Sequence, residues 1–274
     1  MTRVLSGAVL LLLAIGMVWF APPPLVFAMA ELLLVLGFME YVALAKASRH
    51  PVPAVPGCVA AMLVCATFAQ GAFGGVLVPL DVVLVSAVVA LCALTVTRWS
   101  GGATRAGAAD GGDALGLAAA SIFPALYLGL PIGAMIAIRE TRGREALFLL
   151  MLTVIVSDTA QYYSGRAFGR RLLAPVISPK KTVEGALGGF VFGALLLTVL
   201  GAWWLPSVPA ALRAAFGLAI VALGIVGDLF ESMLKRSAGV KDSSALIPGH
   251  GGVLDRIDAL LFAAPVYYVM LKYV

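Results

Sequence analysis

Acidic side chains stand at the adjoining ends of two apolar segments in the C-terminal half of the chain. Asp228 lies near the end of the first segment, and Asp255 and Asp258 open the second, three residues apart. That spacing puts the last two on one face of a helix. Ionisable residues inside apolar spans are costly and indicate a functional site. The three carboxylates could converge on a hard divalent cation such as Mg²⁺, which prefers oxygen ligands and usually keeps substrate phosphates in its shell.

The polar loop between these segments adds groups that suit phosphate. Gly251 and Gly252 let backbone N–H groups approach an anion closely. Basic side chains that could offset phosphate charge are Lys235, Arg236, Lys241 and Arg256. Cations, a metal ion and preorganised donors together are what phosphoryl or nucleotidyl transfer requires. An ordinary basic loop beside a membrane would account for the lysines and arginines, but not for the acids and the neighbouring His-Gly-Gly step.

A second polar segment, residues 158–185, carries similar chemistry. Asp158 ends an apolar run. Ser178 and the proline after it predict the start of a helix whose first turn offers free N–H groups. Lys181 and Thr182 add a charge and a hydroxyl of the kind that binds a nucleotide phosphate. The alternative is a basic cluster beside the membrane that contacts anionic lipid.

The composition of the chain indicates lipid as its solvent. The 274 residues are 62% hydrophobic and 12% charged, and the mean hydropathy is +1.04. Typical soluble domains are roughly 45–50% apolar and about 25% charged. About nine apolar segments are long enough to cross a ~30 Å hydrocarbon core as helices. They are residues 4–20, 25–45, 53–72, 77–97, 114–138, 145–163, 184–204, 211–232 and 255–273. We therefore predict an all-α, polytopic helical membrane protein, with its active site at the cytoplasmic membrane boundary.

These helices are predicted to form a single integral membrane domain over residues 1–274, because the spans leave no room for a separate soluble domain. Residues 1–113 contain helices without a motif, whereas residues 114–274 carry both polar segments. The cysteines show no metal-ligand spacing and are expected to act as small apolar residues. Glu31 and Glu40 lie within a predicted span, and the sequence assigns them no role.

Lys and Arg gather in the loops after the even-numbered spans, which places those loops and the N-terminus in the cytoplasm. The first apolar segment is interpreted as an uncleaved span, since the small-residue site at residues 28–30 lies well beyond its apolar run. One basic loop, residues 139–144, would lie outside. Either it is an exception, or the proline-bearing segment before it does not cross simply. The Gly/Ala-rich residues 101–114 are typical of a flexible loop.

The polar sequence around the acids resembles the signature of the phosphatidate cytidylyltransferases, also called CDP-diacylglycerol synthases. The matching residues are Ser-Met-Leu-Lys-Arg at 232–236, Lys-Asp at 241–242 and Pro-Gly-His-Gly-Gly-Val-Leu-Asp-Arg-Ile-Asp at 248–258. Ile-Ser-Pro-Lys-Lys-Thr-Val-Glu-Gly at 177–185 is similar to a second pattern of that family. A match with so many polar identities is highly specific. It covers residues 120–274, and the N-terminal half matches only in being apolar.

The resemblance implies transfer of CMP from CTP to phosphatidic acid, giving CDP-diacylglycerol and pyrophosphate. It implies a bacterial cytoplasmic (inner) membrane, with the site facing the cytoplasm, and Mg²⁺ as cofactor, with the number of cations left open. Asp228 and Asp255 are expected to be the principal metal ligands, with Asp258 and Asp158 next. The bilayer is an expected partner and nucleic acid is not, while a homodimer is left open.

Because the attacking lipid phosphate is already ionised at neutral pH, basic residues and metal would carry the catalysis by positioning and electrostatics. Catalytic roles are expected for Lys235, Arg236, Lys241, Asp242, His250 and Arg256. Substrate contacts are expected for Arg166, Ser178, Lys181, Thr182, Glu184, Gly251 and Gly252. A histidine such as His250, taken alone, is more often structural than catalytic, and here it is expected as a donor near the phosphates.

Three other functions are weighed against this one. An enzyme of the same class could act on another lipid phosphate, or a lipid kinase could use CTP. An ion-coupled transporter is less favoured, because it predicts two similar halves with broken helices, and the sequence shows no such symmetry.

Overall fold

The computed structural model describes residues 12–75, 78–106, 114–246 and 251–274. Apart from one short hairpin, the regular structure of these residues is helical. A helical stretch at residues 12–20 comes first. The elements that follow are α2 (Pro23–Ala47), α3 (Ala54–Ala66), α4 (Leu80–Ala106), α5 (Ala114–Pro124), the π-helical turn η1 (Ala125–Gly129), α6 (Leu130–Arg142), α7 (Arg144–Phe168), β1 (Leu172–Ala174), β2 (Ser178–Thr182), α8 (Val183–Trp204), α9 (Ala210–Ser237) and α10 (Leu254–Lys272).

Within the described residues, six helical segments are long and apolar enough to cross a membrane. They are Pro23–Ala47, Leu80–Thr97, Ala114–Arg142, Arg144–Phe168, Val183–Trp204 and Ala210–Ser237. The other predicted spans fall short for identifiable reasons. Helix α3 has 13 residues, about 20 Å at 1.5 Å per residue, and α10 begins with charged residues. The segment at 4–20 lies partly outside the described residues.

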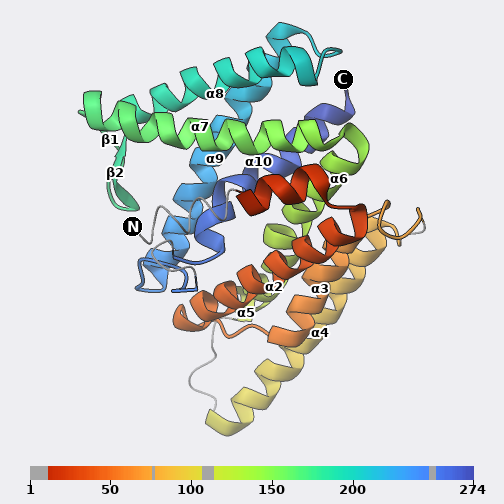
Figure 1. Ribbon diagram of the computed structural model, residues 1–274. Helices are drawn as coiled ribbons and strands as arrows, with labels where there is room; N and C mark the ends of the chain where they lie inside the picture. Colours follow the sequence, from red (N-terminus) through yellow and green to blue (C-terminus); the bar gives the residue numbers. More distant parts are fainter. Residues whose placement is uncertain (1–11, 76–77, 107–113, 247–250) are drawn as a thin grey trace.

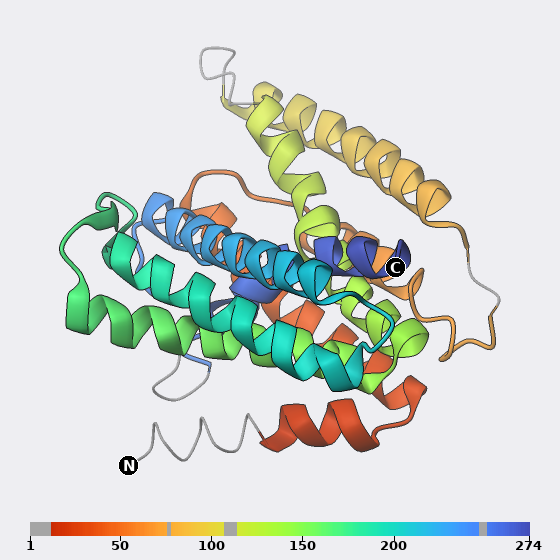
Figure 2. The same cartoon turned by 90° about the horizontal axis from the view of Figure 1, so that it is seen from above.

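The helices form two groups that meet along α10. In Figure 1, α7 and α8 lie side by side, α9 and α10 run beneath them, and α2 to α5 form the other group. Figure 2 shows α7, α8 and α9 in one layer and α4 extending away from it. Helix α10 packs on both groups: Leu254 and Leu261 contact the core of α2, α3 and α6, while Ala263 and Tyr267 contact the core of α7, α8 and α9. The start of α10 therefore lies where the groups join.

The proline-bearing segment before residue 139 forms one long helix. Residues 114–142 run continuously through α5, η1 and α6, with the π-helical turn between Pro124 and Pro131. A proline removes a backbone donor and clashes with the preceding turn, so a locally widened turn relieves the conflict. The predicted span 114–138 is confirmed as helix and extends to Arg142.

Residues 139–144, expected as a basic loop, end α6 and begin α7 on either side of Gly143, and contacts within the protein hold them. Arg139 donates through Nε to the Val18 carbonyl at 3.0 Å and through Nη2 to that of Ala21 at 2.5 Å. Arg144 donates to the Trp19 carbonyl at 3.0 Å and lies over the Trp19 ring. Packing against residues 18–21 therefore explains these arginines, independently of the side of the membrane on which they lie.

Two local predictions are wrong. The helix expected to start at Ser178 begins only at Val183, because Ser178–Thr182 forms strand β2, paired antiparallel with β1. Proline is tolerated in such an edge strand. Thr182 has extended backbone and caps α8 by accepting the Gly185 N–H at 3.1 Å, as N-cap threonines do. The loop expected at 101–114 is helical as far as Ala106, the end of α4.

Candidate active site

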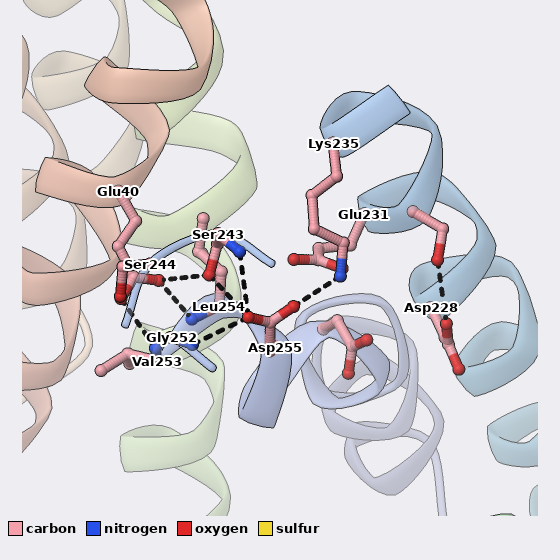
Figure 3. Close-up of polar contacts among 12 residues, drawn as sticks. Glu40, Asp228, Glu231, Lys235, Ser243, Ser244, Gly252, Val253, Leu254 and Asp255 are labelled. Atoms are coloured by element: carbon pink, nitrogen blue, oxygen red, sulfur yellow. Dashed lines mark hydrogen bonds and ion pairs between the residues drawn. The ribbon is translucent and has the colours of Figure 1, made fainter. Parts of the chain in front are cut away.

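Lys235 and two carboxylates connect the end of α9 to the start of α10. Glu231 is fully buried and forms an ion pair with Lys235, one turn further along α9. The Lys235 ammonium also lies 2.5 Å from Asp255 Oδ1, as Figure 3 shows. Buried charges require paired and well-directed partners to be tolerated. One lysine thus balances two acids from different helices.

Asp255 also organises the loop that leads into α10. Its Oδ2 accepts from the backbone N–H groups of Ser243 and Gly252, at 3.1 and 2.8 Å, and lies 2.9 Å from the Ser243 hydroxyl. Gly251 has a φ of +77°, which favours glycine. A Cβ on Gly252 would lie 2.1 Å from Ser243 Oγ. The backbone angle at Gly251 and the close contact at Gly252 therefore favour glycine at both positions, in addition to the predicted phosphate contact.

The loop surrounds the side chain of Glu40 in α2, a residue to which the sequence assigned no role. Its carboxylate accepts hydrogen bonds from the Ser243 and Ser244 hydroxyls and from the backbone N–H groups of Val253 and Leu254, at distances of 2.7 to 2.9 Å. Only 5% of the residue is exposed. An acid within an apolar span is a sequence signal for a functional residue. The sequence could not identify the hydrogen-bond donors of Glu40, because they lie about 200 residues away in the chain.

A second polar cluster forms where α7, β2, α9 and α10 meet. The Lys181 ammonium lies 2.5 Å from Asp228 Oδ2, so the two polar segments of the sequence lie at the same end of the protein. Asp258 interacts electrostatically with Asp228 and Asp158. Asp158 also accepts from the Gln161 amide at 3.1 Å. Three of the four predicted metal ligands are therefore neighbours.

Close approach of α9 and α10 brings these acids together. A Cβ on Gly227 would lie 2.4 Å from the carbonyl oxygen of Asp258, which is too close for any other residue without a shift of the backbone. Gly227 precedes Asp228 directly, so the contact between the helices sets the distance between the two aspartates. Asp255 belongs to the Lys235 network instead, and within the described residues it makes no hydrogen bond to Asp228.

The acids provide hard oxygen donors of the kind that Mg²⁺ prefers. Within the described residues, no three His, Cys, Asp or Glu side chains are already gathered closely enough to ligate an ion. The charges nevertheless fit a cation, because Asp158, Asp228 and Asp258 repel one another and the single charge of Lys181, paired with Asp228, is fewer than the three carboxylates. The donor chemistry is therefore suited to a divalent ion.

The remaining predicted residues have varied surroundings. Arg166 is exposed on α7, 3.5 Å from the Tyr162 hydroxyl. Glu184 accepts from the backbone N–H groups of Arg170 and Arg171 and pairs with the Arg171 guanidinium. It therefore supports the turn between α7 and β1. Exposed charged residues of the signature are Arg236, Lys241, Asp242 and Arg256. His250 lies outside the described residues.

The fold and site define a helical membrane protein with lysines and carboxylates gathered at the ends of its helices. The chain belongs to the Cytidylyltransferase family, whose sequence model matches residues 1–274.

Three curated relatives carry the name phosphatidate cytidylyltransferase. The Haemophilus influenzae protein is 48% identical over 131 residues, which is 45% of this chain and 45% of that protein. The Synechocystis protein is 50% identical over 127 residues, 46% and 43% of the two chains. The Mycobacterium bovis protein is 37% identical over 170 residues, 61% and 55% of the two chains. The chain thus matches about half the length of these relatives.

Proposed function

We propose that this protein transfers CMP from CTP to phosphatidic acid, giving CDP-diacylglycerol and pyrophosphate. Membership of the Cytidylyltransferase family and similarity to proteins named phosphatidate cytidylyltransferase support the proposal. The observation that carries it is the ion pair of Lys181 with Asp228. Through it, both polar segments, each matching a pattern of the family, belong to one site.

The reaction depends more on electrostatic stabilisation of the phosphates than on proton transfer. An ionised oxygen of the lipid phosphate attacks the α-phosphorus of CTP, and the bond from that phosphorus to the oxygen bridging to the β-phosphate breaks. Pyrophosphate leaves with the electron pair. Since both reactants are anions, the barrier is lowered by positioning and by positive charge at the phosphates. Lys181 and Lys235, each held by carboxylates, are the residues that we assign to this task.

We further propose Asp158, Asp228, Asp255 and Asp258 as the oxygen donors for Mg²⁺. The mutual repulsion of Asp158, Asp228 and Asp258 supports this assignment. Asp228 and Asp255, the predicted principal ligands, are each paired with a lysine, and their joint role stays a prediction. A bound Mg²⁺ ion would supply neutralisation of negative charge on the phosphate oxygens.

The proposed setting is the bacterial cytoplasmic membrane, with the site facing the cytoplasm. In this arrangement the first apolar segment, α3 and α10 are also embedded, which gives about nine segments in the bilayer. The acyl chains of the substrate then stay in the lipid while its phosphate reaches the helix ends. The excess of Lys and Arg in the loops next to the site supports this orientation.

An assay with radiolabelled CTP tests the function. The purified protein in detergent receives phosphatidic acid, Mg²⁺ and CTP labelled at either the α- or the γ-phosphate. We expect α-label, and no γ-label, in the chloroform-soluble product. Transfer of γ-label would indicate a lipid kinase instead. A panel of other lipid phosphates identifies the acceptor, and a protein that labels no lipid from either CTP would contradict the proposal.

A further inference from the structure

Glu40 connects the N-terminal helices to the loop that carries the family's signature. Helix α10 begins at Leu254, and the side chain of its N-cap residue, Val253, makes no capping hydrogen bond. Glu40, from α2, takes that place by accepting the N–H groups of both residues, at 2.8 and 2.9 Å. An anionic side chain at a helix N-terminus satisfies free N–H groups and interacts favourably with the helix dipole. The start of α10 is therefore capped by a residue from the other half of the chain.

The carboxylate of Glu40 is also one step from Asp255. The Ser243 hydroxyl lies 2.9 Å from Glu40 Oε2 and 2.9 Å from Asp255 Oδ2. Asp255 in turn holds Lys235 at 2.5 Å. Figure 3 shows this series of contacts from α2 through the loop to α9. Glu40 is therefore connected to Asp255 in two ways, through the Ser243 hydroxyl and through the N–H groups of the two residues that precede Asp255.

The packing around Glu40 leaves little freedom for another arrangement. A Cβ on Gly252 would lie 2.4 Å from Glu40 Oε2. Both carboxylate oxygens accept two hydrogen bonds each, so four donors converge on one buried group. Residues in such outer positions orient the groups that act on the substrate, and their loss typically reduces activity by about 10–100-fold.

We infer that Glu40 is a positioning residue, which holds residues 243–254 so that Asp255 and Lys235 keep the orientation needed for transfer. The inference rests on the proposed function. It also gives the N-terminal helices, which carry no recognisable motif, a direct part in the site. A residue that only stabilised the fold would change the yield and the melting temperature, but not kcat per folded molecule.

The first test compares Glu40→Gln with Glu31→Gln. Both acids lie on α2 and are more than nine-tenths buried, but within the described residues the Glu31 carboxylate makes no hydrogen bond to the loop. Glutamine offers one acceptor oxygen and turns an NH₂ group toward the donors that Glu40 binds. We expect Glu40→Gln to lower kcat about 10–100-fold with little change in the KM for CTP, and Glu31→Gln to leave both unchanged. Equal kcat values for Glu40→Gln and wild type would overturn the inference.

Hydrogen exchange gives a readout that does not depend on turnover. In the folded Glu40→Gln protein, we expect the amides of Val253 and Leu254 to exchange faster, with the amides of α7 and α8 unchanged. Unchanged exchange at residues 253–254 would overturn the inference. If the wild type itself labels no lipid, the proposed function fails, and the exchange result still decides whether Glu40 holds the loop.

Ser243→Ala is the second variant, and it decides the matter should Glu40→Gln fail to fold. It removes the hydroxyl shared with Asp255 and leaves the charge of Glu40 in place. We expect kcat to fall in Ser243→Ala. In the double variant with Glu40→Gln, the fold-decrease in kcat should be smaller than the product of the fold-decreases in the two single variants. Ser244→Ala is the matched control and should have a smaller effect, because Ser244 donates to Glu40 and, within the described residues, makes no hydrogen bond to Asp255. A wild-type kcat in Ser243→Ala would refute the connection from Glu40 to Asp255 through the Ser243 hydroxyl. A fold-decrease in the double variant equal to the product of the two single fold-decreases would refute it as well.

Discussion

Lys235 lies between two carboxylates, one on its own helix and one on the next. Glu231 is fully buried, and Asp255 is largely so. Removing the only partner of a buried charge is far more damaging than replacing the whole pair by neutral groups. Under the proposed function, stability and catalysis depend on the same ammonium group, and a single substitution cannot separate them.

A pair of substitutions can separate them. We expect Lys235→Met to abolish transfer and to lower the free energy of unfolding by about 3–5 kcal/mol, because Glu231 is left uncompensated. The double variant Glu231→Gln/Lys235→Met should regain most of that stability and stay inactive. Thermal unfolding in detergent and CTP turnover measure the two effects. Recovery of activity in the double variant would show that Lys235 has no part in the chemistry.

Of the individual residues, the sequence predicted the acids and lysines of the two polar segments, since ionisable groups in apolar spans are rarely accidental. It could not predict their partners. Asp255 was expected beside Asp228, but its hydrogen bonds go to Lys235, Ser243 and Gly252. Which of several nearby donors a carboxylate selects depends on the path of the loop, and the residue types alone do not encode that path.

At the scale of elements, the crossing of α9 and α10 determines the geometry of the acids. A glycine at the point of contact, Gly227, allows the two backbones to approach. That approach sets the distance between Asp228 on α9 and Asp258 on α10. Ridges of larger side chains would hold the helix axes further apart. The hairpin β1–β2 then adds Lys181 to the cluster.

Gly227→Ala tests this contact, with Gly224→Ala as its control. The added Cβ would lie 2.4 Å from the Asp258 carbonyl in the first variant, but 3.5 Å from the Ala259 Cβ, an ordinary contact, in the second. We expect Gly227→Ala to cost about 1–3 kcal/mol of stability through overpacking and to reduce turnover, since the aspartates move apart. Gly224→Ala should resemble wild type in both measurements. Equal behaviour of the two variants would refute a tight crossing at Gly227.

The hairpin illustrates how local rules can mislead. A serine followed by proline is typical of a helix start, yet the chain stays extended until Thr182 and only then becomes helical. Thr182 is an equally good N-cap, so two start signals lie four residues apart. Pairing with Leu172–Ala174 in the hairpin selects the later one, and the start signals themselves do not indicate that pairing.

At the scale of the whole molecule, two helix groups share α10, and the polar end of that helix lies between them. Glu40 adds a polar link from α2 to the contacts that α10 already makes. Because both polar segments lie at one end of the protein, the proposed orientation places the whole site on one side of the membrane.

Cysteine labelling tests that orientation. In a variant with Cys58, Cys65 and Cys92 changed to alanine, a cysteine is introduced either at Val176 in the hairpin turn or at Ser207 between α8 and α9, both exposed. We expect a membrane-impermeant maleimide added to intact cells to label Ser207→Cys and not Val176→Cys. Permeabilised cells should show labelling of both, which controls for reactivity. The reverse pattern would place the site outside the cytoplasm.

The sequence alone determined that the protein is helical and lies in a membrane, because apolar segments of sufficient length leave no other solvent for the chain. It also determined which acids and lysines form the polar segments. Only the structure decided that α3 ends after 13 residues, that Ser178–Thr182 is a strand, and that Glu40 caps α10. The cap joins residues more than 200 positions apart, and the strand depends on its pairing within the hairpin; the residue types at these positions do not encode either partner.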